Sequence, residues 1–210
     1  MMHRFISALL CSSLLFVSVS LTGCGQKKYT SPEAVFEAAK SAVADEDMEG
    51  FMNCLTSESQ DLFSGMLVMI GSMMKGFAAL AGDDADTAEA VSKMEKAFEK
   101  HGLTEDVMKE MEEADESDPT AAMEKLVEPI KDKAAFVADM FEAFKGLDNE
   151  GGSPADQFKG TLKDIKIDGD SASAVLEDGG KTEPIQFKKV KGSWLIHLDP
   201  EEFGGGFPGN

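Results

Sequence analysis

A change of hydrophobic period at residues 148–154, where the sequence reads Asp-Asn-Glu-Gly-Gly-Ser-Pro, constrains the fold most strongly. Before this segment, apolar residues recur every three or four positions, which is the period of an amphipathic helix. After it, short alternating runs are separated by tight glycine turns, which is typical of antiparallel hairpins. The chain is therefore expected to be α+β, with helices first and a four-stranded antiparallel meander after them.

Local signals divide the first half into helices. The sequence Thr30-Ser31-Pro32-Glu33 predicts a helix from there to about Ala44. A short helix is expected over residues 48–55. Ser57-Glu58-Ser59-Gln60 fits a capping box and predicts a third helix that extends to about Ala81.

Further helices are expected before the change of period. One should stop at His101-Gly102, a basic residue followed by glycine, and a short acidic helix should cover residues 105–116. Asp118-Pro119 should cap another helix, which Pro129 kinks or splits. Its apolar stripe is expected to continue through Ile130, Ala134, Val137, Phe141 and Phe144.

The strands are expected over residues 161–167, 171–177, 183–190 and 193–198. Asp168-Gly169-Asp170 resembles the start of a calcium loop but lacks its later ligands, so a hairpin turn is expected there. Residues 31–200 are predicted to form one domain. It comprises a helical part (31–147), a linker (148–156) and the meander (157–200), and a flexible tail follows at 201–210.

The N-terminus has the order of an export signal, with Arg4, an apolar stretch of about 15 residues and then small residues. That stretch is shorter than the roughly 20 residues of a spanning helix. Leu21-Thr22-Gly23-Cys24 resembles the bacterial lipobox. The resemblance implies that residues 1–23 are a cleaved signal peptide and that Cys24 is lipidated; the alternative is an ordinary core cysteine.

A lipidated Cys24 implies a protein anchored in the bacterial cell envelope and facing the periplasm, because two or more acyl chains hold a protein stably at a bilayer. Residues 24–30 then form a membrane-proximal tether. Gly25 is not the aspartate that marks inner-membrane retention in some bacteria, which favours the outer membrane.

The negative net charge argues against nucleic acid and anionic lipid as partners of the folded domain. Without residues 1–23 the formal charge is 19 − 39 = −20, so nucleic acid is not expected as a partner, because phosphate binding needs clustered Lys and Arg. The acidic body should also keep away from anionic lipid, which leaves Cys24, Lys27 and Lys28 to hold it at the membrane.

The roles of Cys54 and of the apolar segment at 65–82 each have two interpretations. Cys54, beside Phe51, Met52 and Leu55, is expected to be a buried hydrophobe, and the alternative is a reactive thiol. Residues 65–82 carry only one charge, Lys75. A core or helix-pair role is favoured for them over a segment that lies on a membrane or binds a partner.

Two parts of the chain resemble a nuclear transport factor 2-like, or SnoaL-like, domain of the kind found in small bacterial lipoproteins. They are Ser31-Pro32-Glu33-Ala34-Val35-Phe36 with the segment at 48–55, and the Gly192-Ser193-Trp194 strand. The resemblance covers roughly residues 30–60 and 158–200 and implies helices wrapped as a cone on a curved sheet. Residues 60–147 depart from it as a long helical insertion.

The sequence has no recognisable catalytic, cofactor or metal-binding motif, and no cofactor or metal is expected. His197, on the last strand, is the one candidate catalytic residue. Two functions remain open. One is a non-catalytic envelope lipoprotein that binds a small apolar ligand or a protein; the alternative is a pocket enzyme of the SnoaL or ketosteroid-isomerase type, with an acid/base pair.

Overall fold

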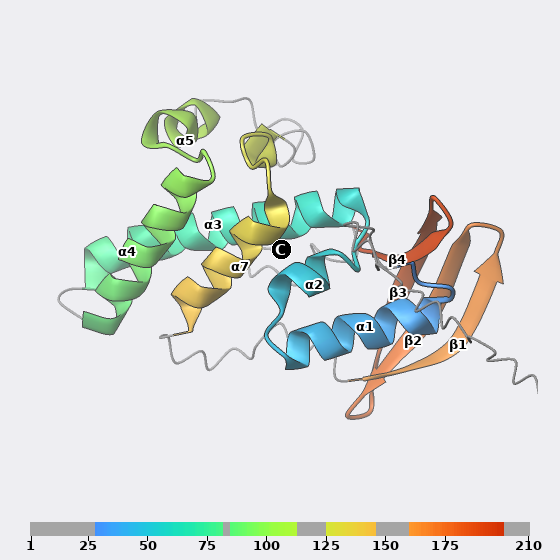
Figure 1. Ribbon diagram of the computed structural model, residues 1–210. Coiled ribbons are helices and arrows are strands. Elements are labelled where there is room, and N and C mark those ends of the chain that lie inside the picture. The colour runs from blue at the N-terminus through green and yellow to red at the C-terminus, as the bar shows by residue number, and fades with distance from the viewer. Residues whose placement is uncertain (1–27, 82–84, 113–124, 146–159, 200–210) are drawn as a thin grey trace, which may run out of the picture.

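The structure is a computed structural model that describes residues 28–81, 85–112, 125–145 and 160–199 (Figure 1). The expected signal peptide at 1–23, Cys24, the expected linker at 148–156 and the expected tail at 201–210 lie outside these residues. Within them the protein is α+β, with helices first and a four-stranded antiparallel sheet after them. The change of period therefore predicts the fold class correctly.

The helices of the described chain are α1 (Pro32–Ala44), α2 (Met48–Met52), α3 (Ser57–Ala81), α4 (Ala85–Lys100), α5 (Glu105–Glu112) and α7 (Lys133–Phe144). The bounds of α1 and α3 and the end of α4 confirm the prediction. α2 ends earlier than expected because the carbonyl of Cys54 accepts a hydrogen bond from Ile196 N at 2.9 Å. Pro129 separates a helical turn at 125–127 from α7.

Side-chain caps begin several of these helices, among them α1 and α3. The Ser31 hydroxyl accepts a hydrogen bond from Ala34 N at 3.2 Å, as predicted for α1. The predicted capping residue of α3, Ser57, was wrong by one position, since Thr56 Oγ1 accepts from Ser59 N at 3.3 Å. Thr56 holds this position because its own N–H donates to the carbonyl of Ile196 at 2.9 Å, outside the helix.

The sheet is a meander with the strand order β1-β2-β3-β4. Its strands are β1 (Thr161–Asp168), β2 (Ser171–Asp178), β3 (Lys181–Val190) and β4 (Ser193–His197). Asp168-Gly169-Asp170 is the turn between β1 and β2, which confirms the hairpin. One face is buried through Ala172, Ala174, Leu176, Ile185, Phe187, Trp194 and Ile196.

Segments far from β4 in the sequence cover its outer edge. Trp194 N donates to the Tyr29 carbonyl at 3.0 Å, and residues 54–56 exchange backbone hydrogen bonds with Ile196. An uncovered edge strand would present unpaired backbone groups to other chains. The N-terminal segment from Tyr29 onward is thus part of the fold, within the span expected to be a tether.

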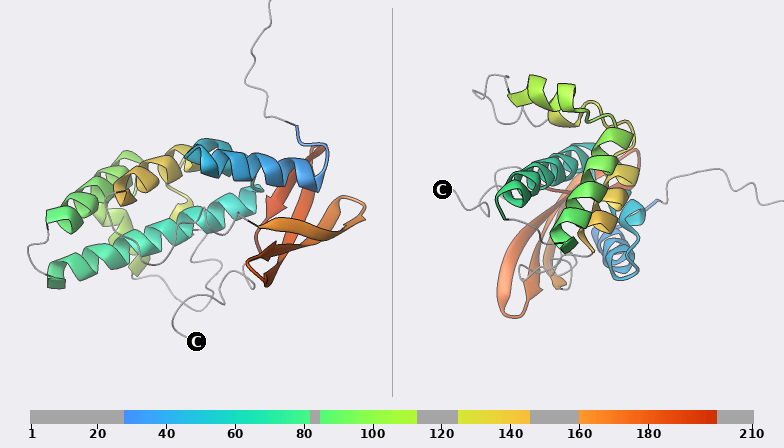
Figure 2. Two further views of the ribbon diagram at one scale, coloured as in Figure 1. Left: turned by 90° about the horizontal axis from the view of Figure 1, so that it is seen from below. Right: turned by 90° about the vertical axis from the view of Figure 1, so that its left-hand side faces the viewer.

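The helical part extends away from the sheet, with the sheet and the start of α1 at one end of the molecule and α4 at the other (Figure 2). α7 packs against α2, α3 and α4. Its buried residues are Phe136, Val137, Met140 and Ala143. The predicted stripe is confirmed, since Ile130 and Val137 are buried and Ala134, Phe141 and Phe144 are half-buried against the same core. A second face of α7 meets α4 through Phe136, which stacks on Phe98.

No helix within the described part of the chain is long and apolar enough to cross a bilayer. In α3, Leu67 and Val68 are buried in the core, whereas Met69 and Met73 are exposed on the surface. The described part of the apolar segment at 65–82 therefore contributes one face to the core, as the favoured interpretation predicts.

Candidate functional site

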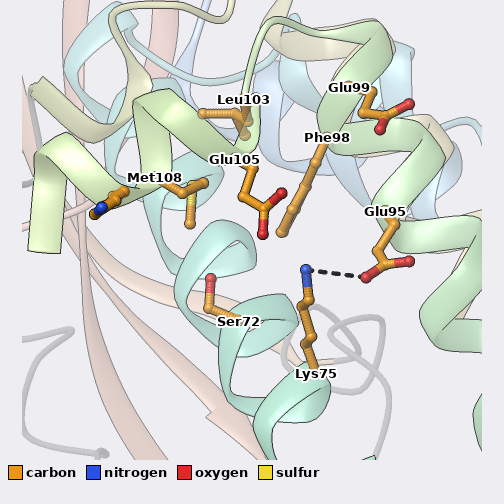
Figure 3. A pocket seen from close by; sticks show the side chains of 9 residues that line it. Ser72, Lys75, Glu95, Phe98, Glu99, Leu103, Glu105 and Met108 are labelled. Carbon is orange, nitrogen blue, oxygen red and sulfur yellow. Dashed lines mark ion pairs between the residues drawn. The ribbon is translucent and has the colours of Figure 1, made fainter.

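A cleft of about 570 Å³ lies between α3, α4 and α5, on the side of the helical part away from the sheet (Figures 1 and 3). Small-molecule sites commonly have volumes of roughly 300–1,000 Å³. The cleft is lined by Ser72, Lys75, Glu95, Phe98, Glu99, Leu103, Glu105, Met108 and Lys109. The lining comprises an apolar set of side chains and a charged set.

The apolar part is formed by Phe98, Leu103 and Met108. Phe98 and Leu103 are buried, and Met108 is half-buried against the core. The ring of Phe98 stacks on Phe136 of α7, with 6.2 Å between the ring centroids. This part of the cleft is therefore continuous with the hydrophobic core.

The charged part is centred on Lys75. Its Nζ lies 3.0 Å from Oε1 of Glu95, and the pKa of Lys75 is raised by this hydrogen bond and by the charge of Glu95. Glu105 adds to the same effect, and its side chain points into the cleft toward Lys75 (Figure 3). One ammonium group thus faces two carboxylates.

Two glycines allow the helices to form this cleft. Gly102, with φ +89°, ends α4 in a conformation that L side chains rarely adopt, and the chain reverses there into α5. Gly71 of α3 lies against α4, where an added Cβ would be 2.7 Å from Cζ of Phe98. The close approach of α3 and α4 therefore depends on the missing side chain at residue 71.

His101 lies at the end of α4, outside the cleft lining. Its ring is edge-on to Phe136, with 5.5 Å between the centroids, and its Nε2 is 2.7 Å from Oδ2 of Asp139. Burial raises the pKa of Asp139, but hydrogen bonds and charge from Lys100 and His101 outweigh it and hold the pKa below its ordinary value. These contacts join α4 to α7.

His197, the candidate catalytic residue from the sequence, is also outside the cleft lining. It lies on the sheet face opposite Trp194 and Ile196, with Nδ1 3.1 Å from Oγ1 of Thr56. Thr56 Oγ1 is in turn 2.8 Å from Oγ of Ser59, which accepts a hydrogen bond from Leu198 N. His197 therefore belongs to a network that ties the start of α3 to β4.

Cys54 is buried, as expected for a small hydrophobe. Its thiol donates to the Gly50 carbonyl at 3.3 Å and lies 3.3 Å from Oη of Tyr29. Burial, followed by the hydrogen bond and charge of Cys54, raises the pKa of Tyr29 well above its ordinary value.

Sequence patterns did not identify the cleft. Lys75 was noticed as the single charge of an apolar segment, but its partners Glu95 and Glu105 lie 20 and 30 residues further along the chain. No local spacing links these positions, because the turn at Gly102 and the packing of α4 on α3 bring them together. An isolated charge in an apolar helix is the one signal that could have pointed to Lys75.

Among the described residues, no three His, Cys, Asp or Glu side chains are grouped as a metal site would require. The predicted acidic helix is described only to Glu112, so the rest of that acidic segment lies outside the described residues.

Comparisons of the chain with protein-family models, curated proteins and solved structures found no match.

Proposed function

We propose that this protein is a bacterial lipoprotein, anchored to the envelope through Cys24 and facing the periplasm, with a folded domain that acts as a non-catalytic binding module. Its ligand is a small molecule with a largely apolar body and one cationic group. The observation that carries the proposal is the cleft between α3, α4 and α5, which combines a core-backed apolar part with a charged part.

The apolar part selects the body of the ligand. Phe98, Leu103 and Met108 line this part, and an apolar group of the ligand that lies against them is removed from water at a gain of roughly 25 cal/mol per Å² of its own surface. The packing of Phe98 on Phe136 keeps this surface preformed. A preformed surface lowers the entropic cost of binding.

The charged part selects a cation. The lining contains Glu95, Glu99 and Glu105 together with Lys75 and Lys109, so it has a formal charge of 2 − 3 = −1. The chain as a whole has a formal charge of −19, and its field draws cations toward the molecule. Glu105, which points into the cleft, is the carboxylate placed to meet the cationic end of a ligand.

Ligand-observed NMR with phenylbutylamine and phenylbutyrate tests this function on the full-length protein in a neutral detergent. The amine should bind and the carboxylate should bind more weakly. Ser72→Trp, which fills the cleft, should abolish binding of the amine, and Glu105→Gln should weaken it. Met69→Trp is the matched control, because Met69 lies on α3 outside the cleft lining and is exposed. Equal binding of both compounds, or unchanged binding to the Ser72→Trp variant, contradicts the proposal.

The anchor has its own test. Mass spectrometry of the protein purified from bacterial membranes should find a chain that starts at Cys24 and carries acyl groups. Cys24→Ser should remove both the lipid and the cleavage. A Cys24→Ser protein that is still cleaved and still partitions into the membrane fraction contradicts lipidation at this residue.

We further propose that α1, α2 and the sheet form a nuclear transport factor 2-like framework, into which the region from α3 to α7 is inserted. In support, α1 packs on β4, and Phe36 and Trp194 belong to one continuous core. An experimental structure checks this proposal, because a flat sheet that α1 does not wrap would be inconsistent with the cone of that family.

A further inference from the structure

The end of the sheet that carries the β1–β2 and β3–β4 turns is rich in lysine. Asp168 pairs with Ser171 and Val190 with Ser193, so both turns lie at this end, and Lys189 N donates to the Asp170 carbonyl at 2.7 Å between them. Here this surface is called the hairpin end. Its lysines are Lys28, Lys166, Lys188, Lys189 and Lys191.

Lys28 reaches the hairpin end through its neighbour. Tyr29 N donates to Oγ of Ser193 at 2.9 Å, directly after the β3–β4 turn, and the Tyr29 carbonyl accepts from Trp194 N. A lysine from the N-terminal segment therefore joins four lysines of the sheet, although the two groups are more than 130 residues apart in the sequence.

The five lysines of the hairpin end have no acidic partner among the described residues, as is also true of Lys96, Lys109, Lys125, Lys131 and Lys181, which are not gathered at this end. The lysines that do form ion pairs with described residues are Lys40, Lys75, Lys93, Lys100, Lys133, Lys145 and Lys163. The ammonium groups at the hairpin end are thus available to an anionic surface, apart from that of Lys189, which lies 5.6 Å from the centroid of the Trp194 ring.

The local charge is opposite to that of the molecule. Asp168 and Asp170 lie in the β1–β2 turn, and Glu58 and Asp199 lie near Lys188, since all three groups act on His197. Five lysines against these four acids give 5 − 4 = +1 in a chain with a formal charge of −19. An anionic surface therefore repels most of the protein and attracts this end.

Apolar side chains are exposed at the same end. Val190 is 42% exposed beside the β3–β4 turn, and Ile167 is 58% exposed beside the β1–β2 turn. Lysines around exposed aliphatic side chains match the headgroup region of a bilayer, which is anionic outside and apolar beneath.

The expected lipid anchor lies close to this end. Five residue steps separate Cys24 from Tyr29, and an extended chain spans at most about 3.6 Å per residue, or roughly 18 Å. Since Tyr29 is bonded to β4, acyl chains on Cys24 hold the hairpin end within that distance of the bilayer.

We infer that the hairpin end is a docking surface for an anionic phospholipid bilayer, an inference that rests on the proposed lipidation of Cys24. Docking turns the sheet toward the membrane. The helices α3, α4 and α5 that line the ligand cleft extend away from the sheet, with α4 at the opposite end of the molecule (Figure 2).

The test uses the full-length lipidated protein with Val190→Cys, labelled with a thiol-reactive fluorophore and placed in vesicles that contain brominated lipids as quenchers. One set of vesicles is phosphatidylcholine alone, and the other contains about one-third phosphatidylglycerol. The unsubstituted protein, whose Cys54 is buried, measures background labelling. Lys188→Glu with Lys191→Glu is compared with Lys96→Glu with Lys131→Glu, an equal charge reversal on exposed lysines of the helical part.

Quenching should be stronger in the anionic vesicles and should weaken in high salt, which screens surface charge. The hairpin-end reversals should lower the ratio of docked to undocked protein at least about 25-fold, from about fivefold per lysine. The helical-part reversals should leave this ratio unchanged. The inference is overturned if quenching is equal in the two kinds of vesicle. It is also overturned if the two double variants lower quenching equally.

Failure of the anchor is distinguishable from failure of docking. Mass spectrometry reports acylation of Cys24 separately. A protein without acyl groups should still co-sediment more strongly with anionic than with neutral vesicles if the hairpin end docks, and equal co-sedimentation overturns the inference.

Discussion

His101 and Asp139 link the end of α4 to α7 through a contact of 2.7 Å between Nε2 and Oδ2. Lys100 Nζ lies 2.6 Å from the same oxygen, and the His101 side chain is 7% exposed. Asp139 is thus the shared acceptor of two basic groups, beside the helix that carries Phe98 of the cleft.

Removal of this acceptor should destabilise the protein. Asp139→Ala leaves the buried His101 ring without its partner, at an expected cost of about 1–3 kcal/mol in the free energy of unfolding. Urea unfolding followed by circular dichroism measures the change. Glu142→Ala, also on α7, removes an exposed ion pair with Lys145 and should have almost no effect. Equal effects of the two substitutions would exclude a special role for Asp139.

Two glycines of α3 should respond to alanine in opposite directions. At Gly71 a Cβ would meet Phe98 at 2.7 Å, so Gly71→Ala should cost about 1–3 kcal/mol. At Gly76 nothing lies within 4 Å, so Gly76→Ala should stabilise the helix by about 0.5–1 kcal/mol. Thermal unfolding of both variants checks the signs, and stabilisation by Gly71→Ala would show that α3 and α4 are further apart.

The cap of α3 can be located by mutation. Thr56 is fully buried and bonds to Ser59 and His197, so Thr56→Ala should lower the free energy of unfolding by about 1–3 kcal/mol. Ser57→Ala should change it little, because Ser57 is exposed and makes no capping contact among the described hydrogen bonds. The reverse order in urea unfolding would restore Ser57 as the cap.

His197 should make stability depend on pH. Burial, with help from the charge of Lys188, lowers the pKa of His197 below its ordinary value of 6.5, and Glu58 and Asp199 only partly oppose this. The folded state therefore binds fewer protons than the unfolded state between the two pKa values. The contribution of neutral His197 to the free energy of unfolding is fully present above pH 6.5, and it is lost as the pH falls through the folded-state pKa of His197. NMR titration measures this pKa, which Lys188→Met should raise; a value at or above 6.5 contradicts the assignment.

Tyr29 is the only tyrosine, so phenolate absorbance reports on it alone. Burial and the contact with Cys54 raise its pKa, and the native protein should ionise well above the ordinary value of 10.0. Because the folded state holds the phenol proton more tightly than the unfolded state, protonated Tyr29 contributes to the free energy of unfolding, and this contribution is lost as the pH rises above 10.0. Cys54→Ala should lower the titration midpoint, and urea should return it to the ordinary value. A native midpoint near that of the unfolded chain would mean that Tyr29 is not packed on β4.

Interactions between near neighbours in the sequence made much of the fold predictable. Ser31 caps a helix three residues away, Gly102 ends α4 through its own backbone, and the alternation around Trp194 sets which side of β4 is buried. The cap at Thr56 was missed because a strand 140 residues later holds that residue.

The sequence alone determined the α+β class, the order and most bounds of the elements, and the burial of Cys54, because period, caps and turns act over a few residues. Only the tertiary structure decided which side chains meet. It placed Lys75 between Glu95 and Glu105, paired His101 with Asp139 and gathered Lys28 with the lysines of β3. These contacts depend on how helices pack and on which segment covers a strand edge, and such long-range choices leave no regular spacing in the sequence.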